Sequence, residues 1–283
     1  MKRVLVVLFA VVGLIAEAQV QTPSASPSAT LSTVIGLTDV KIEYSRPKAK
    51  GRKIFGEGSE FITPYGHMWR TAANNGTLIT FGDDVKVGAS SVPKGTYKLF
   101  TIPGASEWTV ILTKDLTING NDPEGYDQKN DAARVMVKSE KLAEKIETFT
   151  IEISDVAENS KTANLQISWE NTSVKVPITV DYDAKVMKSI EASTKVSPGN
   201  LFNAAVYYLE NGKDLKQALE WVNVAVASNP EGYWMTYQKA RIQKALGDKT
   251  GAMESSMTSK AVAEKAKNMD YVKINDDLMK GLK

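Results

Sequence analysis

Residues 65–77, YGHMWRTAANNGT, form the densest group of side chains in this chain that could do chemistry. The group contains His67, the only histidine, together with Trp69, Arg70 and Asn74. A histidine base needs a serine or cysteine nucleophile and an acid that orients its ring, and the chain has no cysteine. A zinc site is disfavoured as well, because one histidine cannot supply the usual nitrogen and sulfur ligands. We therefore interpret His67 as a partly exposed polar residue, and we predict no catalytic residue, no metal and no cofactor.

The same segment could instead form a binding surface. A tryptophan face stacks on a sugar ring, and asparagine amides exchange hydrogen bonds with hydroxyl groups. In the alternative interpretation Trp69 belongs to a core, Arg70 pairs with a carboxylate, and residues 74–76 form a turn that needs positive φ angles. We favour this alternative, in which the segment serves folding.

A second candidate is the loop RPKAKGRK at 46–53, which carries five positive charges. Such a loop could bind a phosphate, a sulfate or a carboxylate. A solvated charged loop is the more ordinary interpretation. Glycoside hydrolysis by paired carboxylates is a further option, because distance in space rather than spacing in sequence decides it. Acidic residues near these segments are Glu57, Glu60, Asp83, Asp84 and Glu107. Calcium on oxygen ligands at 83–84 or 119–122 is a weaker option, since no EF-hand spacing is present.

Alternating apolar residues predict the elements that position these segments. From about residue 33 to 181 the period is two, as in Val40, Ile42 and Tyr44, and turn formers separate the runs. The expected strands include TLITF at 77–81, TYKLFTI at 96–102, EWTVILT at 107–113, ETFTIEIS at 147–154, ANLQISWE at 163–170 and SVKVPITV at 173–180. We expect the turn between the last two at Glu170–Asn171. This pattern predicts an all-β antiparallel sandwich, jelly-roll-like or barrel-like.

After about residue 182 the apolar period changes to three and four, which predicts an all-α part. We expect a connecting helix over 181–194, two helical hairpins, and a closing helix over 269–282. Ala218 and Ala252 are 34 residues apart, each on the second helix of its pair, which resembles the tetratricopeptide repeat. An ordinary bundle of helical hairpins is the alternative.

The start of the chain has the pattern of a signal peptide. Lys2 and Arg3 precede a twelve-residue apolar run, and cleavage is expected after Ala18. Residues 19–32 are predicted to be a flexible leader, residues 33–181 the β-sandwich domain and residues 182–283 the helical domain. Cleavage removes two basic residues and one acidic residue, which leaves 33 basic and 32 acidic residues. This balance offers no electrostatic footprint for nucleic acid, and no membrane-spanning segment is expected after cleavage.

Four segments of the β-rich half resemble a family of exported bacterial proteins, the domain of unknown function 2911. They are IEYSRPKAKGRKIFG at 42–56, PYGHMWRTAANNGTLITF at 64–81, VPKGTYKLFTIPG at 92–104 and EWTVILT at 107–113. The resemblance implies a β-domain followed by tetratricopeptide-like helices, and it implies no activity. The chain has Ala72 where the family pattern usually has glycine, and Asn75 where an acidic residue is usual. An acid with a catalytic role in relatives would therefore be missing here.

Because RPKAKGRK and WRTAAN are both distinctive in the family pattern, we place any shared site between them. Arginines would face an anionic or polyhydroxyl ligand, and the tryptophan would supply a flat wall. The candidate ligand-binding residues are Arg46, Lys50, Arg52, Tyr65, Trp69, Arg70 and Asn74.

Taken together, these patterns favour a periplasmic or secreted, non-catalytic protein. Its β-domain would bind a ligand or the cell envelope, and its helical tail would bind a protein partner. One alternative is a carboxylate-dependent hydrolase that acts on polysaccharide or another envelope polymer. Another makes the helical half the working part and the sandwich a spacer.

Overall fold

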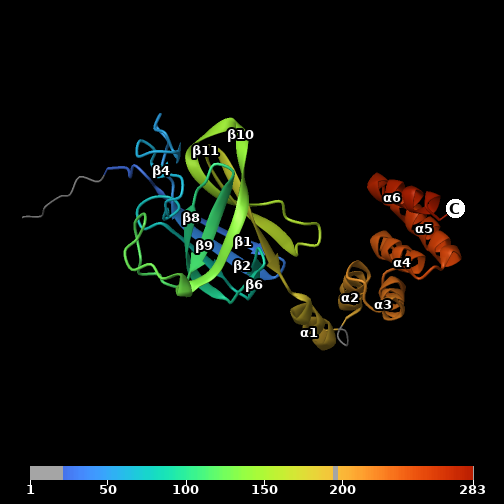
Figure 1. Ribbon diagram of the computed structural model, residues 1–283. Helices are drawn as coiled ribbons and strands as arrows, with labels where there is room; N and C mark the ends of the chain where they lie inside the picture. The colour runs from blue at the N-terminus through green and yellow to red at the C-terminus, as the bar shows by residue number, and fades with distance from the viewer. Residues whose placement is uncertain (1–21, 194–196, 283) are drawn as a thin grey trace, which may run out of the picture.

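The computed structural model describes residues 22–193 and 197–282, which form a β-rich part followed by a helical part (Figure 1). The predicted signal peptide, residues 1–18, lies outside the described residues. Within the described ranges, no helix is both long enough and apolar enough to cross a membrane.

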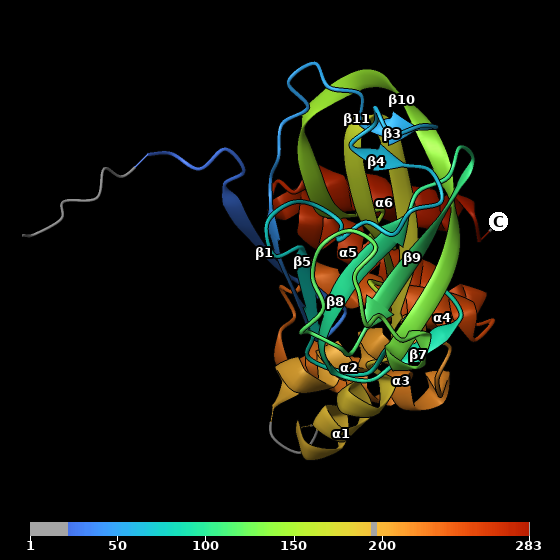
Figure 2. The ribbon, with the colours of Figure 1, turned by 60° about the vertical axis from the view of Figure 1, so that its left-hand side comes forward.

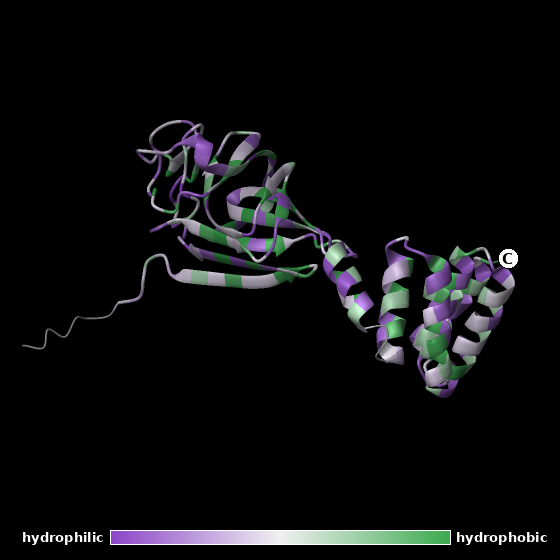
Figure 3. Cartoon of the chain, turned by 90° about the horizontal axis from the view of Figure 1, so that it is seen from below, coloured by the Kyte–Doolittle hydropathy of each residue, from purple (hydrophilic) through white to green (hydrophobic). Residues whose placement is uncertain are grey.

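The β-rich part is built on one antiparallel sheet of nine strands, in the order β1-β2-β5-β8-β9-β10-β11-β6-β7. A short parallel pair, β3 and β4, lies beside it. The strands are β1 (Ser28–Ile35), β2 (Thr38–Ser45), β3 (Phe55–Gly56), β4 (Thr63–Pro64), β5 (Thr77–Phe81), β6 (Val85–Val87), β7 (Ser90–Val92), β8 (Gly95–Ile102), β9 (Glu107–Thr113), β10 (Asp131–Ser154) and β11 (Thr162–Val180). A 3₁₀ turn at Gln128–Asn130 precedes β10. Apolar and polar residues alternate along the strands (Figure 3), which confirms the predicted period of two.

The long strand β10 joins the two halves of the sheet, which face each other across one core (Figure 2). Its residues 131–138 pair with β9, and its residues 139–154 pair with β11. The sheet also closes at one corner, where Phe149 N donates to Pro47 O at 2.8 Å and Ala49 N donates to Glu147 O at 2.8 Å. The result is an antiparallel sandwich with a barrel-like corner, as the alternating sequence predicts.

Two boundaries differ from the sequence prediction. Strand β1 begins at Ser28, inside the segment 19–32 that was expected to be a flexible leader, and all eight of its residues pair with β2. The threonines and the valine of β1 suit a strand, although its composition is typical of a linker. The expected turn at Glu170–Asn171 is absent, and β11 runs through it. Glu170 adopts φ 54°, which makes an irregularity in the pairing with β10 instead of a reversal of the chain.

A loop covers part of the outer face of the sheet. Residues 114–127, between β9 and β10, bring Ile118 onto Phe100 and Ile111, and Met68 completes this small second core. The loop therefore has its own apolar anchor on β8 and β9.

Among the described residues, the helical part contains six helices. They are α1 (Asp183–Ser193), α2 (Pro198–Glu210), α3 (Leu215–Ser228), α4 (Tyr233–Ala245), α5 (Lys249–Lys265) and α6 (Met269–Lys280). Side chains cap several of them; for example, Asp214 accepts from two amides at the start of α3. Small residues such as Ala218 and Ala252 are fully buried where consecutive helices pack. The predicted helical hairpins are thus present, with boundaries within a few residues of those expected.

The two parts meet at the start of α1. Tyr182 packs against Gly36 in the β1–β2 turn, where a Cβ atom would lie 2.4 Å from the tyrosine ring. Gly36 also has φ 59°, so both the close approach of the tyrosine ring and the backbone conformation favour glycine at this position. Lys185 forms an ion pair with Asp83 at 2.5 Å.

Candidate functional site

Trp69 belongs to the interior of the sandwich. It is 2% exposed, stacks on Trp169 with ring centroids 5.9 Å apart, and meets Phe55 and Phe149 edge to face. Its indole nitrogen donates to Ala72 O at 3.2 Å. The ring therefore packs in the core, as in the alternative interpretation of the sequence.

The residues after Trp69 form a tight turn. Thr71, Ala72 and Asn74 all have positive φ angles, of 50°, 104° and 54°. The Asn74 amide donates to Ser45 Oγ at 3.0 Å and ties this turn to the end of β2. The segment therefore serves folding, as we favoured from the sequence, but Asn74 also reaches the surface.

His67 is exposed and lies 2.8 Å from Asp122, from its Nδ1 to Oδ2. The other oxygen of Asp122 accepts from Met68 N at 2.7 Å. This pair fastens the loop 114–127 to the segment that carries Trp69. Neither a serine nor a second acid contacts the His67 ring among the described residues, and these residues contain no group of three or more His, Asp or Glu side chains that could hold a metal.

The arginines of the basic loop, residues 46–53, donate hydrogen bonds to backbone carbonyl groups of the protein. Arg52 donates to Ala49 O at 3.0 Å and to Lys48 O at 2.6 Å, and Arg46 donates to Phe149 O at 3.4 Å. Lys50 is exposed, and its backbone amide donates to the Glu147 carboxylate at 2.7 Å. The guanidinium groups thus hold the shape of the loop.

Tyr65 is half-buried against the main core, and its amide donates to Gly56 O at 2.9 Å. Arg70 is also half-buried. Its Nε has no hydrogen-bond partner within residues 22–193 and 197–282. Of the seven candidate ligand-binding residues, Asn74 is the one that lines the groove described next. A binding role for the others stays a prediction.

A polar groove of about 680 Å³ lies on the outer face of β1, β2, β5 and β8. Its floor follows a single cross-strand row, because Thr30 pairs with Glu43, Glu43 with Leu78, and Leu78 with Lys98. The turn at 74–76 and the loop at 116–119 form its walls. The lining residues are Ser28, Ala29, Thr30, Glu43, Tyr44, Ser45, Asn74, Asn75, Gly76, Leu78, Lys98, Leu116, Thr117 and Asn119.

Lys98 is the unusual member of this row, because it is a lysine that is only 4% exposed. Its ammonium group donates to Ile118 O, and no carboxylate of the described residues lies within 4 Å of it. Burial lowers the pKa of Lys98, while the negative charge of Asp115 opposes this effect in part. The apolar contact of Ile118 with the sheet holds that carbonyl in place.

Carboxamides surround Lys98 at the mouth of the groove. Asn119 donates to Asn75 Oδ1 at 3.5 Å, and Asn74 lies on the same wall. Glu43 is the one carboxylate that lines the groove within the described ranges, and it pairs with Lys41 at 2.9 Å. The groove can therefore offer an ammonium group and several amides to a ligand, whereas a pair of acids for hydrolysis does not converge on it.

Sequence reasoning missed Lys98, although a signal was present. In TYKLFTI the period of two places Lys98 on the same face as Phe100 and Ile102. A lysine on an otherwise apolar face predicts a buried charge. Periodicity alone does not show that the loop 114–127 folds over that face.

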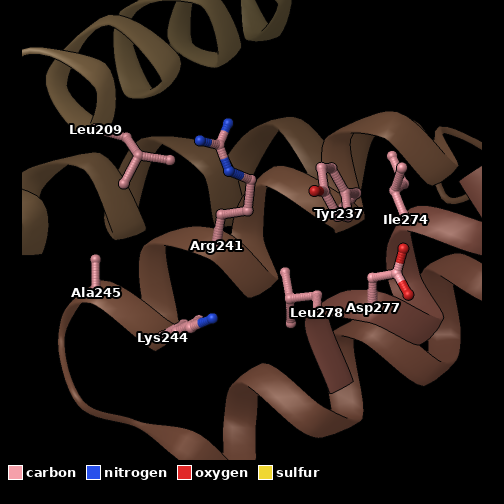
Figure 4. Close-up of a pocket in the computed structure, with 8 residues that line it drawn as sticks. All are labelled: Leu209, Tyr237, Arg241, Lys244, Ala245, Ile274, Asp277 and Leu278. Carbon is pink, nitrogen blue, oxygen red and sulfur yellow. The ribbon is translucent and has the colours of Figure 1, made fainter. Parts of the chain in front are cut away.

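The helical part has a groove of its own, of about 560 Å³, on the side where α2, α4 and α6 meet (Figure 4). Leu209, Tyr237, Ile274 and Leu278 supply apolar side chains to it, and Arg241, Lys244 and Asp277 supply charged ones (Figure 4). Arg241 is paired with Glu210 at 2.6 Å.

Comparison with known proteins gives one match. A family model with the description Protein of unknown function (DUF2911) matches residues 26–178, slightly more than half of the chain. No curated protein and no solved structure matches.

Proposed function

Since the chain belongs to the family described as Protein of unknown function (DUF2911), a description that names no activity, we propose its function from the groove above Lys98. We propose that the β-domain binds an anionic, polyhydroxyl ligand, such as an acidic oligosaccharide, and leaves it chemically unchanged. The observation that carries this proposal is the buried ammonium group of Lys98, which faces a polar groove without a carboxylate partner among the described residues.

Burying a charged group has an unfavourable free energy. Removing an ammonium group from water costs several kcal/mol, and one carbonyl offsets only part of that cost. A carboxylate or sulfate of a ligand would complete the ion pair in a setting where water competes weakly. Amides of Asn75 and Asn119 are suited to neighbouring hydroxyl groups of the same ligand.

Isothermal titration with hexagalacturonate and with neutral maltohexaose tests this proposal. We expect the acidic oligosaccharide to bind more tightly, and Lys98→Met to weaken its binding at least about tenfold. The matched control is Lys94→Met, which removes an exposed lysine just before β8 and should leave binding unchanged. Equal binding by the Lys98→Met variant, or no binding of hexagalacturonate at millimolar concentration, would refute the proposal.

The hydrolase alternative is tested with the same ligand. Because Glu43 is the one lining carboxylate of the described groove and is paired with Lys41, we expect hexagalacturonate to stay intact during prolonged incubation. Appearance of shorter oligosaccharides, lost in Glu43→Gln, would establish hydrolysis instead.

We also propose that the helical part binds a protein segment, as stacked helical hairpins of the tetratricopeptide type often do. The groove between α2, α4 and α6 has apolar side chains and charged side chains of both signs, which supports a segment with apolar and charged residues. Crosslinking in cells with a photoreactive residue in place of Tyr237 tests this, with exposed Met257 on the α5–α6 side as the control position. Identical crosslinked partners from both positions would count against the groove.

Export to the periplasm or beyond is part of the same proposal, and the apolar run at 4–15 supports it. Edman sequencing of the protein purified from its host should begin at Gln19. A mature protein that begins at Met1 would contradict it.

A further inference from the structure

Strand β1 forms one edge of the nine-stranded sheet, and Figure 2 shows it at the rim of the β-domain. Its eight residues, SATLSTVI, include no charged residue and no proline. Sheet edges in natural proteins are usually protected by charge, proline, a bulge or very short length, because an open edge pairs with other strands. Strand β1 has none of these protections.

The register with β2 identifies the open backbone groups. A two-residue turn, Gly36–Leu37, makes Ile35 and Thr38 a hydrogen-bonded pair, and pairs then alternate along the ladder. The backbone of Leu31 and Thr33 therefore points toward β2. The backbone groups that point away from β2 belong to Ser28, Thr30, Ser32 and Val34, and within the described residues none of these four has a hydrogen bond on that side.

The exposure of the β1 side chains is consistent with an open edge. Ala29 and Leu31 face the core but are only partly buried, because no further strand covers them. Val34 is 55% exposed, and Leu37 at the turn is 51% exposed. A strand added to this edge would cover Ala29, Leu31 and Val34.

We propose that β1 pairs antiparallel with β1 of a second copy of this chain, so that two β-domains share one continuous sheet. A register centred on Leu31 brings Thr30 opposite Ser32 of the second copy, and Ser28 opposite Val34. It forms about eight new backbone hydrogen bonds. The strand is neutral, so a copy meets no like charge, and the nearest charged pair, Lys41–Glu43, is already neutralised on β2.

This pairing also joins the two grooves. A two-fold axis perpendicular to a sheet keeps the same face of both copies on the same side. Ser28 and Thr30 line the groove above Lys98, so the grooves of the two copies would lie next to each other across the shared edge. A polymer could then contact both grooves at once, with the gain in affinity that bivalent binding brings.

Sedimentation velocity of the purified protein, from about 1 to 200 µM, tests the proposal. The interface is small, so we expect a dimer with a dissociation constant of roughly 1–100 µM. Ser32→Pro should raise that constant at least about tenfold, because it removes an outward N–H group and keeps every bond to β2. Ser32→Ala keeps the N–H group and is the matched control.

Circular dichroism and the unfolding temperature of each variant show whether β1 stays folded, and Val34→Lys provides a second way to block the edge without altering the backbone. A monomer at 200 µM would overturn the proposal. So would a dimer that both folded edge variants leave unchanged. Neither result depends on whether the groove binds hexagalacturonate.

Discussion

Lys98→Met should make the protein more stable while it weakens ligand binding. The substitution keeps an unbranched side chain of similar length and removes a charge that is 4% exposed. In the folded protein that charge has lost most of its water and has gained one hydrogen bond, to Ile118 O. Lys98 therefore lowers the stability of the folded protein and lies at the floor of a groove. Both properties are expected of a residue that is kept for ligand binding.

The size of the gain follows from the two opposing effects. Desolvation of the ammonium group costs several kcal/mol, and its charge-assisted hydrogen bond returns about 1.5–3 kcal/mol. The variant also leaves Ile118 O without this donor, which costs about 1 kcal/mol. We expect a net gain of about 1–2 kcal/mol in the free energy of unfolding, which is a rise of roughly 2–8 °C in Tm for a protein of this size.

The gain should depend on pH with a definite sign. Burial lowers the folded-state pKa of Lys98 below its unfolded value of about 10.4, so the unfolded chain binds more protons between the two pKa values. Wild-type stability therefore rises with pH through that window, and the Met variant lacks this rise. Its advantage is full at neutral pH and shrinks as the pH approaches about 10.

Urea unfolding at pH 7 and pH 10, followed by tryptophan fluorescence, measures the effect. Lys94→Met serves as the control and should change stability by less than about 0.5 kcal/mol. A Lys98→Met variant that is less stable than wild type at pH 7 would show that the ammonium group is well solvated or paired in solution. That result would remove the physical basis of the proposed site.

Three further predictions concern the framework around the groove. Ala72→Gly should raise the free energy of unfolding by about 1 kcal/mol, because alanine is strained at φ 104°; a decrease in urea midpoint would contradict this. Trp69→Ala should lower the free energy of unfolding by about 3–5 kcal/mol, whereas Trp234→Ala on the helical part, where the residue is 36% exposed, should lower it much less. Similar losses in the two variants would place Trp69 outside the core. Asp83→Asn should cost about 0.5–1 kcal/mol at pH 7, since the hydrogen bond from Lys185 lowers the pKa of Asp83. That stability is present above the unfolded pKa of about 3.9 and is lost as the pH falls through the folded pKa, so wild type and variant should converge near pH 3.

Local periodicity explains why much of the fold was predictable. The inward set Val40, Ile42 and Tyr44 and the stripe that contains Ala218 are each determined by neighbours in sequence, and the structure buries them as the pattern indicates. Strand β1 was missed because its small polar residues are equally typical of a linker. The first two thirds of β10, residues 131–146, were missed because their charged residues interrupt the alternation.

The candidate site was harder to predict, because it depends on contacts between distant segments. The Arg52 guanidinium binds carbonyl groups of its own loop, and no local pattern shows that choice. Lys98 becomes buried only when the loop 114–127 folds over β8, fixed by Ile118 and by the His67–Asp122 pair. Sequence patterns identify each of these segments, but they do not show which segments contact one another in the fold.

The central claim is that the Lys98 ammonium group receives an anion in the groove on the outer face of the sheet. A crystal structure of the protein soaked with trigalacturonate tests it most directly. We expect a carboxylate within hydrogen-bond distance, about 2.7–3.2 Å, of Lys98 Nζ, with hydroxyl groups near Asn75 and Asn119. An empty groove with the sugar bound elsewhere on the protein would show that Lys98 does not receive the anion.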